Sequence, residues 1–163
     1  MKKINLLIST FFGYGYLTKL PGTVTSFVTT IFIYIAYEYL GYTNLKFSII
    51  FFILLFLYSF YAVKDSESEF KNKDPRQIVI DEVLGQAMPL ILVLYLNQSN
   101  QLNIQIEIYY VLSFVFFRFF DIFKPFPVSY FDKNFKNYFG IIMDDIMAGL
   151  YSMLLIYLIS LKF

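Results

Sequence analysis

Adjacent carboxylates stand at two places where an apolar run of this chain meets a polar loop. Asp81 and Glu82 follow one such run, and Asp144 and Asp145 interrupt another. An ionised carboxylate in apolar surroundings is unfavourable unless it is paired, hydrogen-bonded or bound to a cation, and two adjacent ones also repel each other. The sequence therefore predicts that positive charge, from side chains or from a metal ion, lies beside these acids.

A third acid, Asp121, stands at the end of another apolar segment, shortly before Lys124 and Pro125. Because Pro125 disfavours a helical conformation of the residue before it, a helix should stop near Phe123. Asp121 then lies in the last helical turn, where the helix dipole disfavours an anion, and Arg118 one turn earlier can pair with it. A residue that breaks a local rule in this way often marks a functional site.

The composition restricts the chemistry of such a site. The chain contains no His and no Cys, which excludes imidazole bases, imidazole metal ligands, disulfides and thiolate zinc sites. Oxygen-only ligands suit Mg²⁺, Mn²⁺ or Ca²⁺. We therefore predict a divalent-metal site in which carboxylates hold the ion, the ion activates water, and basic side chains hold a phosphate.

The predicted metal-binding and catalytic acids are Asp81, Glu82, Asp121, Asp144 and Asp145, with Asp132 as a further candidate. The predicted phosphate ligands are Arg118, Lys124, Lys19 and Thr23. The alternative is that the acids pair locally with Arg118, Lys124 or Arg76 and only anchor helix ends.

Length and composition favour a membrane protein. A chain of 163 residues is one domain, here 1–163. It is 58% hydrophobic and 15% charged, with a mean hydropathy of +0.61, whereas soluble domains contain roughly 45–50% apolar and about 25% charged residues. An unusually apolar soluble helical bundle is the alternative. A net charge of +1 gives no electrostatic reason to expect a nucleic-acid partner.

The elements that must position the acids are apolar helices. They are predicted at 27–40, 47–63, 83–96, 104–123 and 146–161. The second of these has 17 residues without a charge, roughly 26 Å of helix at ~1.5 Å per residue, against a hydrocarbon core of about 30 Å. The expected fold is all-α, a multi-pass membrane bundle of about four or five hydrophobic helices with a polar site at one membrane face.

The connecting segments are predicted as follows. Residues 1–20 resemble an amphipathic interfacial segment more than a cleaved signal peptide, because no small-residue cleavage site follows. Residues 13–26 contain Gly and Pro and are predicted as a loop that ends in a helix N-cap at Thr25 or Ser26. The N–H groups of that helix start could hold a phosphate, although a plain capped turn explains the same residues. Residues 64–76 are expected to be solvated, and 126–140 to be a loop.

Basic residues are unevenly distributed between the loops. All Lys and Arg residues except Lys46 and Lys162 fall in 1–26, 64–82 and 118–145, the loops that alternate to one side of the membrane. The positive-inside rule places this side in the cytoplasm. The three acidic edges fall on the same side, so we predict one polar site at the cytoplasmic membrane surface.

Four stretches of the chain resemble the phosphatidylglycerophosphatase A family. They are residues 13–23, Ile80–Gly85, Phe117–Pro127 and Gly140–Gly149, which occur in the family's order. The resemblance implies a bacterial inner-membrane enzyme of phospholipid synthesis that uses Mg²⁺ to remove the terminal phosphate of phosphatidylglycerophosphate. It also implies that the five acids bind metal and catalyse, and that Arg118 and Lys124 clamp the phosphate. No obligate protein partner is implied.

One position departs from the family pattern. Thr25 stands where the family usually has Gly, and Thr adopts a positive φ less readily than Gly. The role of the loop around Pro21–Thr23 is therefore open.

Two other function classes fit the clustered acids. A small membrane cation carrier would place acids deep inside its spans, whereas here the acids sit at span ends, apart from Glu38 and Glu107, which lie toward the opposite face. A structural membrane subunit would not need acids gathered at one face.

Overall fold

The computed structural model describes residues 2–70 and 75–162, and this part of the chain is helical throughout, without a strand. The helices are α1 (Lys2–Ser9), α2 (Pro21–Glu38), α3 (Leu45–Glu67), α4 (Ile80–Gln98), α5 (Ile106–Phe123), α6 (Val128–Asn134) and α7 (Tyr138–Lys162), with a 3₁₀ turn, η1, at Tyr14–Tyr16. The all-α prediction is confirmed. Lys71, Lys73 and Asp74, which belong to the segment 64–76 that was predicted to be solvated, lie outside the described residues.

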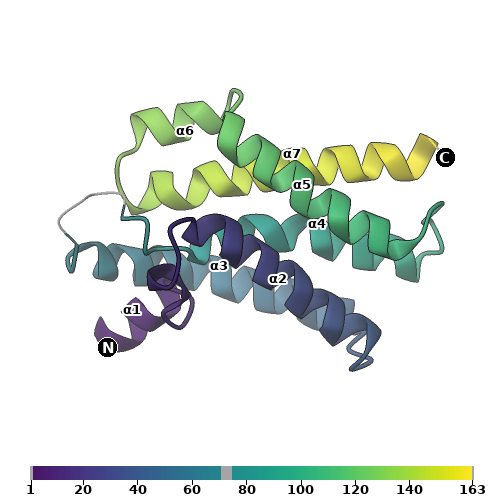
Figure 1. Cartoon of the computed structure of the whole chain (residues 1–163), viewed down its shortest axis with the longest axis horizontal. Helices are drawn as coiled ribbons and strands as arrows, with labels where there is room; N and C mark the ends of the chain where they lie inside the picture. Colours follow the sequence, from purple (N-terminus) through teal and green to yellow (C-terminus); the bar gives the residue numbers. More distant parts are fainter. Residues whose placement is uncertain (1, 71–74, 163) are drawn as a thin grey trace.

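The long helices alternate in direction along the bundle (Figure 1). The starts of α2, α4 and α7 and the ends of α3 and α5 lie toward the end of the bundle that also holds α1 and α6, hereafter the α1/α6 end. The α2–α3 and α4–α5 turns and the end of α7 lie at the opposite end. All segments predicted to carry the site therefore meet at the α1/α6 end.

Three described helices, α3, α4 and α7, are long and apolar enough to cross a membrane. Helices α2 and α5, predicted as further spans, fall outside this set, since α2 starts with polar residues and α5 carries three charged side chains. Helix α4 is central: 61% of its 18-residue apolar stretch is buried inside the bundle. The corresponding share for α3 is 17%, so α3 presents most of its surface outward, as a lipid-facing helix does.

Helices α4 and α7 approach closely through two glycines. A Cβ atom added to Gly85 of α4 would lie 2.6 Å from the carbonyl oxygen of Asp145 on α7. A Cβ added to Gly149 of α7 would lie 2.5 Å from the carbonyl oxygen of Gly85. Small residues at a helix contact let backbones approach in this way. The contact sets Asp145 beside the first turn of α4.

The predicted start of α2, at residue 27, is wrong. Helix α2 begins at Pro21, because proline suits the first helical position, where its missing N–H is not needed. Thr25 and Ser26, predicted as N-caps, lie inside the helix and are buried. Thr25 is not among the described positive-φ residues. The φ argument for a strained loop at Thr25 therefore does not apply.

The predicted loop at 126–140 is also wrong. It contains α6 and the start of α7. The Asn137 side chain accepts hydrogen bonds from the N–H groups of Phe139 and Gly140, at 3.1 and 3.3 Å, which satisfies donors at the start of α7. Phenylalanines at four-residue intervals pack ring against ring from α6 into α7: the Phe131–Phe135 and Phe135–Phe139 centroids are 5.9 and 5.3 Å apart.

Helix α1 is fixed to the bundle by polar contacts. The buried Asn5 donates to Asp65 at 2.7 Å and accepts from the Tyr58 hydroxyl at 2.6 Å. The carbonyl oxygen of Ser9 accepts a hydrogen bond of 2.8 Å from the backbone N–H of Val79. This last bond ties the end of α1 to the segment that leads into α4 and its two acids.

Candidate metal and phosphate site

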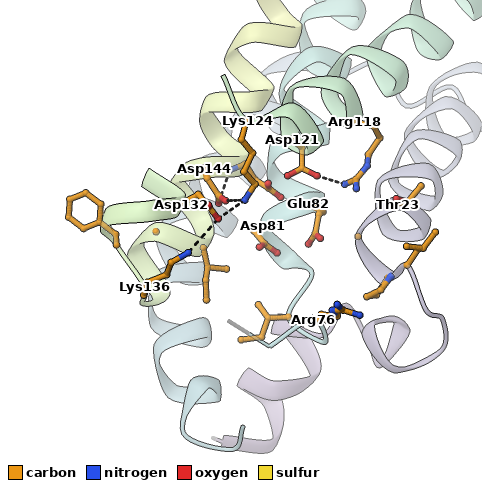
Figure 2. A pocket seen from close by; sticks show the side chains of 18 of the residues that line it. Thr23, Arg76, Asp81, Glu82, Arg118, Asp121, Lys124, Asp132, Lys136 and Asp144 are labelled. Atoms are coloured by element: carbon orange, nitrogen blue, oxygen red, sulfur yellow. Dashed lines mark hydrogen bonds and ion pairs between the residues drawn. The ribbon is translucent and has the colours of Figure 1, made fainter. Parts of the chain in front are cut away.

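One cavity of about 340 Å³ at the α1/α6 end gathers the residues that the sequence singles out. Its lining includes all five predicted acids and all four predicted phosphate ligands, namely Asp81, Glu82, Asp121, Asp144, Asp145, Arg118, Lys124, Lys19 and Thr23. Figure 2 shows carboxylates from α4, α5 and α7 pointing toward a common space. The cavity is open at one side and is of a size that suits a small charged group.

Three of the acids form a group with metal-site geometry. One carboxylate oxygen from each of Asp81, Glu82 and Asp145 lies within 4.8 Å of the other two. Asp81 and Asp145 are buried, with 8% and 4% of their surface exposed. Oε2 of Glu82 and Oδ2 of Asp145 are buried without a hydrogen-bond partner among the described residues. A cation would satisfy these oxygens, and the all-oxygen donor set fits a hard divalent ion.

Glycines make room for this acidic group. Asp81 and Glu82 occupy the first turn of α4, where the helix dipole favours anions. Gly22 of α2 packs directly against the Glu82 carboxylate, so that any added Cβ would overlap Oε1. On the other side, Gly85 lets α7 bring Asp145 close. The group therefore depends on small residues in two neighbouring helices.

Asp121 lies outside this three-acid group and pairs with Arg118. The predicted pair is confirmed, with Nη1 of Arg118 2.6 Å from Oδ2 of Asp121. Both side chains are largely buried, at 15% and 14% exposure. Nε of Arg118 is buried and makes no hydrogen bond within residues 2–70 and 75–162. The guanidinium, which lines the cavity with Thr23 (Figure 2), thus keeps a donor that no described residue uses.

Lys124 joins three elements at one ammonium group. It follows α5 in a left-handed conformation (φ 45°, ψ 57°), and its Nζ lies 2.7 Å from Oδ1 of Asp132 on α6 and 2.6 Å from Oδ2 of Asp144 on α7. Burial alone lowers the pKa of Lys124, but the charge of Asp144 and the hydrogen bonds to both acids raise it above its ordinary value. The ammonium is therefore fully charged at neutral pH.

Asp132 shows the reciprocal effect. Partial burial raises the pKa of its carboxyl, but the hydrogen bond and charge of Lys124, together with the charges of Lys136 and Lys133, lower it below the ordinary value. Lys136 lies 3.8 Å from the same carboxylate.

The contacts of the site divide the five predicted acids into two sets. Asp81, Glu82 and Asp145 form the group with metal-site geometry, whereas Asp121 and Asp144 pair with basic residues, as in the alternative in which the acids pair locally.

Lys124→Met is expected to destabilise the protein by about 2 kcal/mol, because it leaves Asp132 and Asp144 without their cation in a partly buried place. Thermal unfolding in detergent, followed by circular dichroism, measures the loss. Lys133→Met, which removes an exposed lysine of α6, is the matched control and should change little. Adding Asp144→Asn to Lys124→Met should restore part of the stability. Equal unfolding temperatures for the two single variants would contradict this role.

Three charged residues of the cavity lining were missed by the sequence analysis or named only as a lesser candidate. Arg76, Asp132 and Lys136 line the cavity with the others. Arg76 belongs to the segment predicted to be solvated, and it is exposed at the cavity. Asp132 lies on α6 and Lys136 follows the end of that helix at Asn134, and the sequence had predicted neither the helix nor its end.

Comparison with known proteins identifies relatives along nearly the whole chain. The family model described as Phosphatidylglycerophosphatase A matches residues 7–160. A Haemophilus influenzae protein named Phosphatidylglycerophosphatase A is 34% identical over 165 residues, covering 98% of this chain and 94% of the relative. An Escherichia coli protein of the same name is 27% identical over 154 residues, covering 94% of this chain and 82% of the relative.

A Bacteroides thetaiotaomicron protein, provisionally named a phosphatidylinositol-3-phosphatase, is 34% identical over 152 residues, covering 93% of this chain and 90% of the relative. No solved structure matches. The relatives' names thus agree on a phospholipid phosphomonoester and differ in the head group that carries it.

Proposed function

This chain belongs to the phosphatidylglycerophosphatase A family, and we propose that it hydrolyses the terminal phosphomonoester of phosphatidylglycerophosphate to phosphatidylglycerol and phosphate. The observation that carries the proposal is the single cavity in which the carboxylates of Asp81, Glu82 and Asp145 face the guanidinium of Arg118. Acids that hold a cation, beside a basic group that binds phosphate, are the components that phosphoryl transfer requires.

We further propose that Asp81, Glu82 and Asp145 hold Mg²⁺. An ion held by these three carboxylates would supply positive charge for the phosphoryl oxygens and would lower the pKa of a bound water. Arg118 donates to a non-bridging phosphate oxygen, and Asp121 fixes the orientation of that guanidinium through their 2.6 Å ion pair. The ion pair of Lys124 and Asp144 joins the end of α5 to the first turns of α7, and this contact keeps Asp145 in place beside α4.

The proposed location is the bacterial inner membrane, with the cavity facing the cytoplasm. The basic residues support this orientation. Lys19, Arg76 and Lys136 lie at the cavity, while the opposite end of the bundle carries Lys46 at the start of α3. By the positive-inside rule the α1/α6 end is the cytoplasmic one. A substrate's acyl chains then stay in lipid while its phosphate reaches the cavity.

A second candidate substrate follows from the Bacteroides relative. Phosphatidylinositol-3-phosphate, like phosphatidylglycerophosphate, carries a phosphomonoester on a polyol that a phosphodiester joins to diacylglycerol. The cavity chemistry proposed here acts on the group that both lipids share. The choice between them rests on contacts to the polyol.

The test is phosphate release by the purified protein in detergent micelles, with each of the two lipids and with Mg²⁺ or EDTA. We expect release from phosphatidylglycerophosphate in Mg²⁺, and loss of at least most of it in EDTA, because the acidic group without a cation binds no phosphate. A preference for the inositol lipid would replace the substrate and keep the site. A folded, Mg²⁺-loaded protein that releases phosphate from neither lipid would contradict the proposal and favour the cation-carrier alternative.

A further inference from the structure

A second hollow lies on the outside of the bundle, between the start of α6 and the face of α7. It has a volume of about 210 Å³ and is lined by Pro127, Met147, Leu150, Tyr151 and Leu154. The lining is apolar apart from one hydroxyl. Leu150 and Leu154 are 43% and 51% exposed, so the groove opens at the outer surface of a helix long and apolar enough to cross a membrane.

The groove is lined by the same two chain segments that contribute to the candidate site, although the two hollows share no lining residue. Its two walls belong to the segments that carry Lys124 and Asp144, whose side chains meet at 2.6 Å in the cavity. Pro127 and Met147 each follow these residues by three positions along the chain. From Asp144 to Leu154 the helix rises roughly 15 Å at ~1.5 Å per residue, toward the opposite end of the bundle. The groove thus follows α7 from one helical turn beyond Asp144 toward the opposite end of the bundle.

The walls of the groove are held in place by contacts on their inner side. The Tyr151 hydroxyl donates to the carbonyl oxygen of Phe126 at 2.6 Å, which joins α7 to the residue before Pro127. The rings of Phe120 and Tyr151 stack with centroids 5.0 Å apart. Phe117, Val128 and Ala148 are fully buried beneath them. The hollow is therefore a preformed feature between two fixed elements.

We propose that this groove binds one acyl chain of the phospholipid substrate while its phosphomonoester occupies the cavity. The inference rests on the proposed function, because it needs a substrate with a phosphate at one end and hydrocarbon at the other. A chain laid along Met147, Leu150 and Leu154 buries its methylene groups against apolar side chains. The Lys124–Asp144 pair lines the cavity, three positions along the chain before the groove residues Pro127 and Met147.

Photolabelling tests the groove without turnover. The probe is phosphatidylglycerol with a diazirine in one acyl chain, in detergent micelles with the full-length protein. We expect adducts concentrated in residues 147–154 of α7, and Leu150→Trp should reduce them about fivefold by filling the groove. Leu158→Trp is the matched control, since Leu158 is a similarly exposed leucine of the same helix, outside the groove.

Kinetics give the second readout. Leu150→Trp should raise KM for a dioleoyl substrate about tenfold with little change in kcat, and should leave hydrolysis of the deacylated head group unchanged. Adducts spread evenly over α3 and α7, or equal losses in Leu150→Trp and Leu158→Trp, would overturn the proposal and indicate bulk lipid. If Leu150→Trp reduces labelling only because it changes the oligomeric state, the proposal is overturned and the groove is a contact between two copies of the chain. A wild type that labels in the groove but hydrolyses neither substrate would contradict the proposed function instead.

Discussion

Asp145→Asn is expected to lower phosphate release by about a thousandfold or more while the protein stays folded. The substitution keeps the shape of the side chain and removes its charge. Asp145 is 4% exposed and shares its space with Asp81 and Glu82, so loss of its charge removes the one proposed metal ligand that α7 adds to the acidic group of α4. Phosphate release and thermal unfolding, each with and without Mg²⁺, measure both parts of the expectation.

The stability result distinguishes a metal ligand from a structural acid. Without metal, Asp145→Asn should be at least as stable as wild type, because it removes repulsion between buried carboxylates. In excess Mg²⁺ only the wild type should gain unfolding temperature, since a ligand that binds the folded state stabilises it. Glu107→Gln, at an exposed acid at the start of α5, is the control and should behave as wild type. Full activity in Asp145→Asn would move the chemistry to Asp81, Glu82 or Asp121.

Gly85→Leu is expected to destabilise the bundle by about 3 kcal/mol and to abolish activity. A Cβ at this position would lie 2.5 Å from Cε2 of Phe117 and 2.6 Å from the Asp145 carbonyl oxygen. The ring can shift, but the carbonyl belongs to the α7 backbone and can move only if the two helices separate. Their separation would carry Asp145 away from Asp81 and Glu82.

The measurements are unfolding in detergent and Mg²⁺-dependent phosphate release. Ala87→Leu adds a similar volume to a half-buried position of the same helix and should cost less than about 1 kcal/mol. Gly85→Leu protein as stable and active as the Ala87→Leu control would show that α4 and α7 do not need this close approach.

The parts of the fold that follow from local rules were predictable from the sequence. Pro125 placed the end of α5 at Phe123, where it lies. Long apolar runs located the three helices that can cross a membrane. The start of α2 was missed because its first turns carry polar residues after Pro21. The start of α7 was missed because the charged Asp144 and Asp145 were taken to precede the helix, whereas the Asn137 side chain caps a helix that already includes them.

The candidate site was predictable as a set of residues but not as a set of contacts. The unfavourable position of Asp121 in its helix correctly indicated Arg118 as partner, since both lie on one helix. Which acids share a cation depends on how α4, α5, α6 and α7 meet. The sequence alone could not separate Asp144, which Lys124 holds, from its neighbour Asp145, which faces α4. The missed Arg76 reaches the cavity from a segment whose charges resemble ordinary solvated ones.

The alternation of the long helices also determines how the chain's two ends relate to the membrane. Helices α4 and α7 both start at the α1/α6 end, so both can cross a membrane only if α5 leads back between them, as α2 leads from α1 to the start of α3. Five passes along the bundle leave α1 and the far end of α7 on opposite sides, as Figure 1 places them at opposite ends of the bundle. A reporter fused after α7 would therefore sample the compartment that the phosphate site never faces, and one fused before α1 would share the compartment into which phosphate is released.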